Sequence, residues 1–134
     1  MKILIVEDDE DLRISFSQLL ELEGYEPICA CHGQEALDIL KNMQELPSLI
    51  LLDLMMPIMD GFTFRKIQVQ DPHLSQIPIV IMTAHRNVDI QKIKTGTSPM
   101  VYMQKPVDLD EMISIIHHFS KPLEETASKA LPVV

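Results

Sequence analysis

The sequence predicts an α/β protein with a parallel β-sheet covered by helices on both faces. Short runs of consecutive apolar residues alternate along the chain with longer stretches in which apolar residues recur at helical spacing. Continuous apolar runs are typical of strands buried on both faces. The β-then-α alternation occurs five times, which is the pattern of a parallel sheet.

The first two strands and helices follow from the N-terminal third of the chain. Residues 2–6, KILIV, are apolar and rich in β-branched residues, so they predict a buried strand. Leucine and phenylalanine then recur at helical spacing, and Gly24 ends this helix. Residues 25–30, YEPICA, predict a weaker strand, and Pro27 places it at an edge of the sheet. The second helix ends before Pro47.

The remaining elements follow in the same order. Residues 48–53, SLILLD, predict a continuously apolar third strand, and a helix should begin after Gly61. The fourth strand is IPIVIMT, residues 77–83, and the helical stretch at 86–96 is only weakly amphipathic. The last strand is MVYMQ, residues 100–104. The final helix has apolar residues at helical spacing, namely Leu109, Met112, Ile113 and Ile116.

Length and charge limit the class of protein. A chain of 134 residues suits one domain, which we expect at 1–119, with a solvated or weakly helical tail at 120–134. The net charge of −9 argues against a duplex-DNA binder, so we predict no nucleic-acid partner. No apolar run approaches the length of a membrane span, and the acidic start is unlike a signal peptide. We therefore expect a cytoplasmic protein without membrane association.

Polar residues stand where the predicted strands end: Glu7, Asp8, Asp53, Thr83 and Lys105. Ligands of parallel sheets bind beyond the carboxyl ends of the strands, so these residues should share one cleft. Two carboxylates 4 Å apart repel by about 4 kcal/mol at an effective dielectric constant near 20, and Mg²⁺ relieves such repulsion. A metal ion, a lysine and a hydroxyl suit phosphoryl transfer, with Asp53 as the nucleophile because it stands alone in its loop.

The chain resembles the receiver domain of two-component response regulators, of the single-domain, chemotaxis-regulator-like type, over about residues 1–119. Four motifs carry the resemblance in the family's order and spacing: LIVEDD (4–9), LLDLMMPIMDG (51–61), MTA (82–84) and KP (105–106). The resemblance implies a flavodoxin-like doubly wound sheet with strand order 2-1-3-4-5. It also implies a cis peptide bond between Lys105 and Pro106.

The resemblance assigns a role to each matching residue. Asp53 would be the phospho-acceptor, and Thr83 and Lys105 would contact the phosphoryl group. The ligands of Mg²⁺ would be Glu7, Asp8, Asp53 and the backbone carbonyl of Met55. Thr83 and Tyr102 would form the switch that carries the signal to the surface.

Each assignment has a structural alternative. The acids after the first strand could simply favour a helix N-terminus, which is our interpretation of Asp9, Glu10 and Asp11. Taken singly, Thr83 could be a cap, Lys105 a surface residue and Tyr102 part of the core. The motifs occurring together in register favour the functional interpretation. The adjacent His117 and His118, at a helix end, are interpreted as solvated residues rather than as phospho-relay histidines.

Two features depart from the family pattern. Receivers often have a Gly-Ala pair just before the fifth strand, whereas here Gly96 comes two residues early and Ser98-Pro99 fill that place. The helix expected at 86–96 is also weak. Both features concern the helix 4–strand 5–helix 5 face, on which we expect an unknown downstream partner protein.

We expect a stand-alone phosphorylation switch, not an enzyme, that assists only its own phosphorylation and dephosphorylation. Asp53 would accept a phosphoryl group from a sensor histidine kinase or a histidine phosphotransfer protein in a Mg²⁺-dependent reaction. Two alternatives are a Mg²⁺-dependent phosphatase with an aspartyl nucleophile and a scaffold that never needs phosphate. Phosphatases of the haloacid-dehalogenase type need a second aspartate two residues after the nucleophile, and this position holds Met55.

Overall fold

A parallel sheet forms the centre of the molecule, as the sequence predicts. The computed structural model describes residues 1–93, 96 and 98–120. The strands are β1 (Lys2–Val6), β2 (Glu26–Ala30), β3 (Leu49–Asp53), β4 (Ile79–Thr83) and β5 (Met100–Gln104). They pair in the order β2-β1-β3-β4-β5, and every pair is parallel. The predicted fold class, the strand order and the edge position of the strand containing Pro27 are confirmed.

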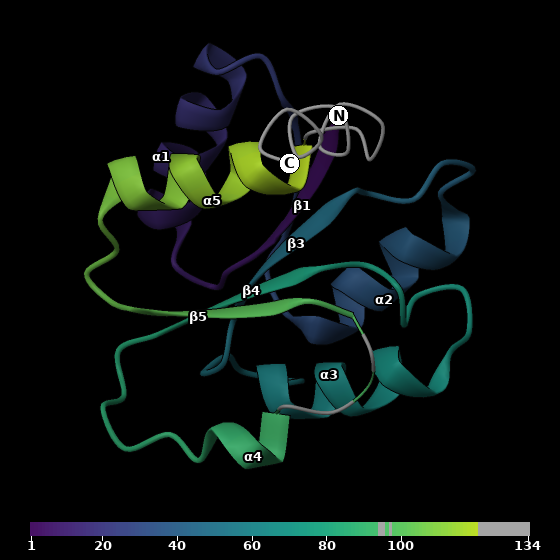
Figure 1. The fold of residues 1–134 in the computed structure, drawn as a ribbon. Coiled ribbons are helices and arrows are strands. Elements are labelled where there is room, and N and C mark those ends of the chain that lie inside the picture. The colour runs from purple at the N-terminus through teal and green to yellow at the C-terminus, as the bar shows by residue number, and fades with distance from the viewer. Residues whose placement is uncertain (94–95, 97, 121–134) are drawn as a thin grey trace, which may run out of the picture.

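Helices cover both faces of this sheet. They are α1 (Glu10–Leu22), α2 (Gly33–Asn42), α3 (Gly61–Gln70), α4 (Ile90–Ile93) and α5 (Leu109–Ser120). Figure 1 shows α1 and α5 on one side of the sheet and α2, α3 and α4 on the other. The weak pattern at 86–96 corresponds to α4, which in the described part of the chain is a single short turn of helix.

Two apolar layers form the core, one on each face of the sheet. Successive residues of a strand point to opposite faces, so a strand that is buried on both sides must be apolar throughout. The layer beneath α2, α3 and α4 includes Leu4, Val6, Ile50, Leu52, Ile79 and Ile81. The layer beneath α1 and α5 includes Ile3, Ile5, Leu49, Leu51, Val80 and Met82.

A buried arginine joins α3 to the segment before β5. The Arg65 side chain donates from Nη1 to Gln68 Oε1 at 2.7 Å and to Ser98 Oγ at 3.2 Å. Burial lowers the pKa of this guanidinium. Ser98 is one of the two residues that stand where receivers, which the chain resembles, often have a Gly-Ala pair. This departure supplies a hydrogen-bond acceptor to a buried charge.

The predicted tail, residues 120–134, lies outside the described residues except for Ser120, which ends α5. Within the ranges that the structure describes, none of the helices combines the length and the apolar character needed to cross a membrane.

Candidate functional site

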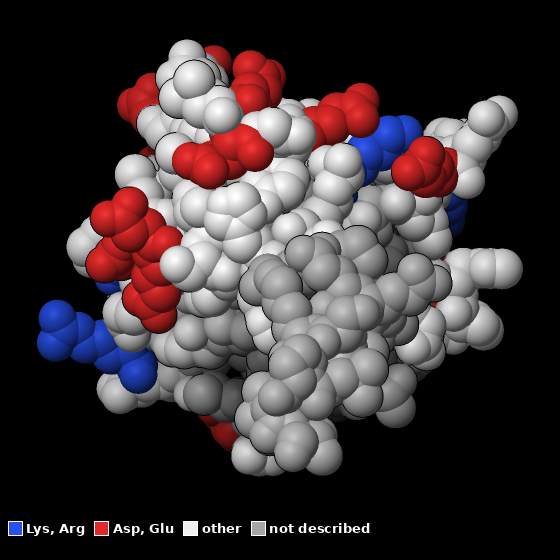
Figure 2. All heavy atoms as spheres, turned by 45° about the horizontal axis from the view of Figure 1, so that its top comes forward, with Lys and Arg blue, Asp and Glu red and all other residues white. Residues whose placement is uncertain are grey.

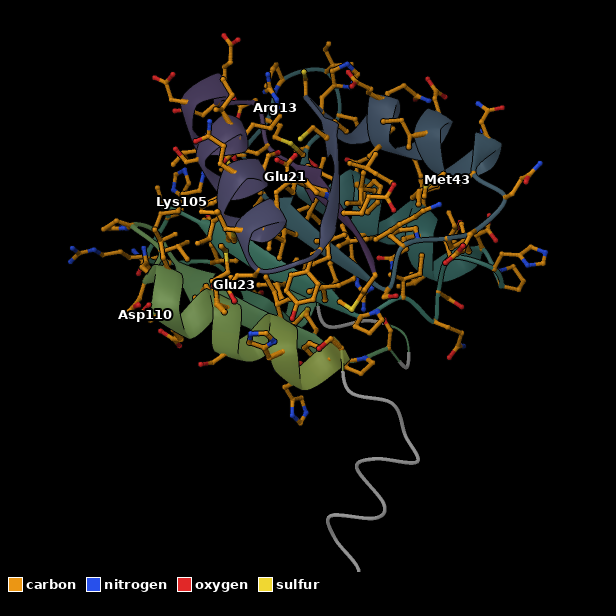
Figure 3. All side chains as sticks on the ribbon, turned by 90° about the horizontal axis from the view of Figure 1, so that it is seen from above. Arg13, Glu21, Glu23, Met43, Lys105 and Asp110 are labelled. Atoms are coloured by element: carbon orange, nitrogen blue, oxygen red, sulfur yellow. The ribbon has the colours of Figure 1, made fainter. Side chains whose placement is uncertain are left out.

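The predicted site residues lie at the carboxyl edge of the sheet. Asp53 and Thr83 are the last residues of β3 and β4, while Glu7 directly follows β1 and Lys105 directly follows β5. The strands β1, β3, β4 and β5 are neighbours in that order, so residues distant in the sequence meet at this edge. In Figure 3, Lys105 lies beside α1, in the loop that leads from β5 to α5.

Lys105 joins the carboxylates that follow β1 and end β3. Its Nζ lies 2.5 Å from Glu7 Oε1 and 3.4 Å from Asp53 Oδ2. Glu7 is completely buried and Asp53 is 4% exposed, so solvation by water hardly stabilises the charge of either carboxylate. Burial alone would lower the pKa of the Lys105 ammonium, but the hydrogen bond to Glu7 and the charges of Asp53 and Glu7 outweigh it and raise that pKa.

The ammonium of Lys105 does not balance the negative charge of the carboxylates around it. Burial raises the pKa of the Glu7 carboxyl to about 8, the hydrogen bond and charge of Asp53 add to this effect, and Lys105 opposes it. The Glu7 carboxyl in this cluster is therefore protonated more readily than an isolated glutamate. A divalent cation would supply the missing charge and displace that proton, so metal affinity should rise with pH.

The carboxylates form a group that fits a small divalent cation. Glu7, Asp8 and Asp53 each offer one oxygen, and these oxygens lie within 4.8 Å of one another. Ligands about 2.1 Å from an octahedral Mg²⁺ lie at most about 4.2 Å apart, so small side-chain rotations would bring all three into its shell. Asp8 is exposed, which leaves space for the waters that Mg²⁺ usually keeps.

The loop between β1 and α1 is held in place by a residue that sequence reasoning missed. Arg13 Nη1 donates to the carbonyl of Glu7 at 2.9 Å and to that of Asp8 at 3.3 Å. An arginine on the first turns of a helix is common, so nothing in the sequence singles out Arg13. Asp9 caps α1 by accepting from the Leu12 N–H at 3.2 Å, as the helix-start interpretation of this residue expects.

Thr83 and Tyr102 both contact the backbone of the loop after β4. Thr83 Oγ1 accepts from the His85 N–H at 3.2 Å, and the Tyr102 hydroxyl donates to the His85 carbonyl at 3.1 Å. Gln104, which the sequence analysis did not single out, donates to the Ala84 carbonyl at 3.1 Å. A movement of Thr83 would therefore alter the hydrogen bond of Tyr102, because both side chains bond to the backbone of His85.

The loop after the buried aspartate, residues 54–60, folds back onto the end of β3. The Gly61 N–H donates to the Leu54 carbonyl at 2.9 Å, which joins the two ends of the loop. A β-carbon on Gly61 would lie 2.6 Å from the Asp53 carbonyl oxygen and 2.8 Å from Leu54 Cα. Only glycine allows this close approach, so Gly61 shapes the loop. The Met55 N–H donates to Asp53 Oδ1 at 3.3 Å, whereas its carbonyl as a metal ligand stays a prediction.

Ile58, in the same loop, has a strained backbone. Its φ is +69°, and the Met59 N–H donates to the Pro57 carbonyl at 2.8 Å, which closes a γ-turn around it. Left-handed backbone costs a residue with a β-carbon about 1–2 kcal/mol, and a β-branched residue is a clear outlier there. The Met59 carbonyl also accepts from the Gly33 N–H at 3.0 Å, which holds the loop against α2. The bond between Lys105 and Pro106 is cis, as expected.

Comparison with known proteins gives a consistent result. A family model described as the response regulator receiver domain matches residues 3–117. Sporulation initiation phosphotransferase F of Bacillus subtilis is 36% identical over 112 residues, which cover 83% of this chain and 86% of that protein. Regulatory protein AtoC of Escherichia coli is 32% identical over 117 residues, or 86% of this chain, but the match spans only 24% of AtoC. The crystallised chemotaxis protein CheY4 of Vibrio cholerae has a TM-score of 0.78 at 26% identity, covering 88% of this chain and 97% of CheY4.

Proposed function

The chain belongs to the response regulator receiver domain family, and we propose that it is a phosphorylation switch whose acceptor is Asp53. The phosphoryl group would come from a phosphohistidine of a sensor histidine kinase or of a histidine phosphotransfer protein. The observation that carries the proposal is the position of Asp53. It is a nearly buried carboxylate that lies 3.4 Å from an ammonium and beside two further carboxylates.

In the proposed reaction a carboxylate oxygen of Asp53 attacks the phosphorus atom of the phosphohistidine. The P–N bond breaks as the new P–O bond forms, and the imidazole leaves with the electron pair and takes up a proton. The Met55 N–H, which donates to Asp53 Oδ1, orients the carboxylate. The Lys105 ammonium is positioned to stabilise the oxygens of the transferred group as charge spreads over them.

We propose Mg²⁺ as the cofactor, held by Glu7, Asp8, Asp53 and the backbone carbonyl of Met55. When bound, the ion would neutralise the charge of the phosphoryl oxygens and of the carboxylates. Arg13 would support this site indirectly, because it fixes the backbone that carries Glu7 and Asp8.

The test is phosphorylation by a small donor. Acetyl phosphate with Mg²⁺ should add one phosphoryl group to the protein, measured by intact mass, and chelation of Mg²⁺ should prevent it. Asp8→Asn removes one proposed ligand and should slow labelling about tenfold or more. Asp11→Asn, which removes an exposed acid outside the cluster, is the matched control and should label like the wild type. Equal labelling of the Asp8 variant and the wild type would show that Asp8 is not a ligand.

The same preparation distinguishes a switch from a phosphatase. With p-nitrophenyl phosphate as an external phosphoester we expect no turnover, because Met55 stands where a phosphatase of this kind needs its general acid. Repeated turnover would contradict the proposal. Absence of labelling by acetyl phosphate would instead favour the scaffold.

We propose the α4–β5–α5 face as the surface that meets a downstream protein. An open groove of about 470 Å³ lies between β5 and α5 and is lined by Val101, Ile115 and Phe119 among others. The net charge of the chain is −9, and acidic side chains outnumber basic ones on the side shown in Figure 2, where α1 and α5 lie. This charge supports a protein partner rather than nucleic acid. We also propose a cytoplasmic location.

Thr83 should transmit the chemistry to this face. Binding of a phosphoryl mimic such as beryllofluoride with Mg²⁺ should draw the Thr83 hydroxyl away from the His85 N–H and release the Tyr102 hydroxyl from the His85 carbonyl. The chain has two tyrosines and no tryptophan, so in a Tyr25→Phe background Tyr102 is the only tyrosine. Acrylamide quenching of its fluorescence should fall on addition of the mimic, because the ring becomes less accessible.

Thr83→Ala in that background provides the comparison. The alanine cannot hydrogen bond to the mimic, so the change in quenching should be several times smaller although the mimic still binds. An unchanged response in the Thr83 variant would show that the change at Tyr102 does not depend on the Thr83 hydroxyl, which would contradict the proposed role of Thr83.

A further inference from the structure

Ile58 occupies a position for which the fold gives no reason to keep an isoleucine. The positive φ penalises any β-carbon, and a β-branched one most. The surroundings fix this conformation, because the loop is tied to α2 by Met59 and Gly33 and to β3 by Gly61. A glycine would adopt the same backbone without strain.

Packing within the domain does not compensate for this strain. The Ile58 side chain is 80% exposed and belongs to neither apolar layer of the described residues. Leu22 is similarly exposed, but its backbone is helical and unstrained. Ile58 thus combines a strained backbone with an apolar side chain that the isolated domain leaves exposed to solvent.

The position of Ile58 indicates where that side chain is used. Ile58 is three residues before Gly61, whose backbone lies against that of Asp53, so Ile58 lies at most about 16 Å from the acceptor. A protein that brings a phosphohistidine to Asp53 must centre its contact on this edge of the sheet. A typical interface covers about 800 Å² on each partner, or a patch roughly 16 Å in radius, which includes Ile58.

We infer that Ile58 is a contact residue for the protein phosphodonor, which buries this side chain in an apolar site beside its phosphohistidine. This inference rests on the proposed function. The net charge of −9 suits a donor with a basic rim around that apolar site. The strained turn holds the side chain outward before binding, so little conformational freedom is lost on contact. Small donors do not contact this side chain, so the rate at which they phosphorylate Asp53 should not depend on it.

The experiment compares a protein donor with a small donor. Purified, autophosphorylated histidine kinases of the organism that encodes this chain are first tested for rapid transfer to the wild type. Ile58→Gly is then assayed with the fastest of these kinases and with acetyl phosphate. We expect the ratio of the two rates to fall about tenfold in the variant, which is typical for truncation of a central contact residue. The same variant should melt a few degrees higher than the wild type because the strain is removed.

Two further variants make the result specific. Ile58→Leu keeps an apolar side chain of the same size at the same place and should keep most of the wild-type ratio. Leu22→Ala removes an equally exposed apolar side chain at the far end of α1 and should leave the ratio unchanged. An unchanged ratio in Ile58→Gly would overturn the inference. Loss of labelling by acetyl phosphate in the wild type would overturn the proposed function itself, so the two failures are distinguishable.

Discussion

Replacement of Asp53 by asparagine should abolish phosphorylation of the chain by acetyl phosphate and by any protein donor. An amide is a poor nucleophile, and Asp53 is the carboxylate of the cluster that ends a strand, 3.4 Å from Lys105 Nζ. Intact mass should show no incorporation after times at which the wild type is fully labelled. The expected loss is therefore down to background rather than a partial reduction.

The loss should not come from unfolding. Asp53→Asn removes one negative charge from a cluster that has a single ammonium, so the variant should melt at or above the wild-type temperature without Mg²⁺. Asp60→Asn is the matched control, because Asp60 caps α3 through Thr63 and asparagine can replace it in that role. This control should label normally. Undiminished labelling of the Asp53 variant would assign the acceptor to another residue.

Gly61→Ala should destabilise the fold more than any other single methyl group added at the site. Both close neighbours of the added carbon, at 2.6 and 2.8 Å, are backbone atoms of Asp53 and Leu54 and cannot rotate away. Overpacking of this kind costs about 3 kcal/mol, or roughly 10 °C in melting temperature for a domain of this size. The measurement is thermal or urea unfolding followed by circular dichroism.

The sign of this effect makes the test sharp. Gly61 is the first residue of α3, and alanine is normally preferred to glycine in a helix by up to about 1 kcal/mol. If the loop could move aside, the variant would be more stable than the wild type. Gly24→Ala is the control, because a β-carbon there meets no atom within 4 Å and costs only the left-handed backbone conformation, about 1–2 kcal/mol.

Most of the sheet could be predicted because its strands are buried on both faces. The apolar runs at 2–6 and 100–104 match β1 and β5, while the other three strands begin one or two residues later than predicted. Local pattern does not fix such ends, because strand pairing decides where a ladder stops. The helix at 86–96 is reduced to α4 in the described part of the chain, since its pattern offers little apolar surface to bury.

The assembly of the site could be predicted, but not its supporting contacts. Glu7, Asp53 and Lys105 lie at the carboxyl ends of strands, and the topology alone brings these ends together. Arg13 reaches the site only through the three-dimensional path of its side chain. Ile58 was missed because the usual sequence signals of a positive φ are glycine, asparagine and aspartate. Strain at an isoleucine becomes visible only when the backbone is known.

The ion pair between Glu7 and Lys105 joins residues that are 98 positions apart. During synthesis β1 leaves the ribosome first, and the acceptor strand β3 follows well before Lys105 is made. A nascent chain that already carries Asp53 therefore lacks the ammonium that stabilises its carboxylates. Under the proposed function, the chain would become competent for phosphorylation only when β5 has joined the sheet and brought Lys105 to Asp53. In a mixture of nascent and completed chains, a kinase would then phosphorylate only the completed ones, because only these have Lys105 beside Asp53.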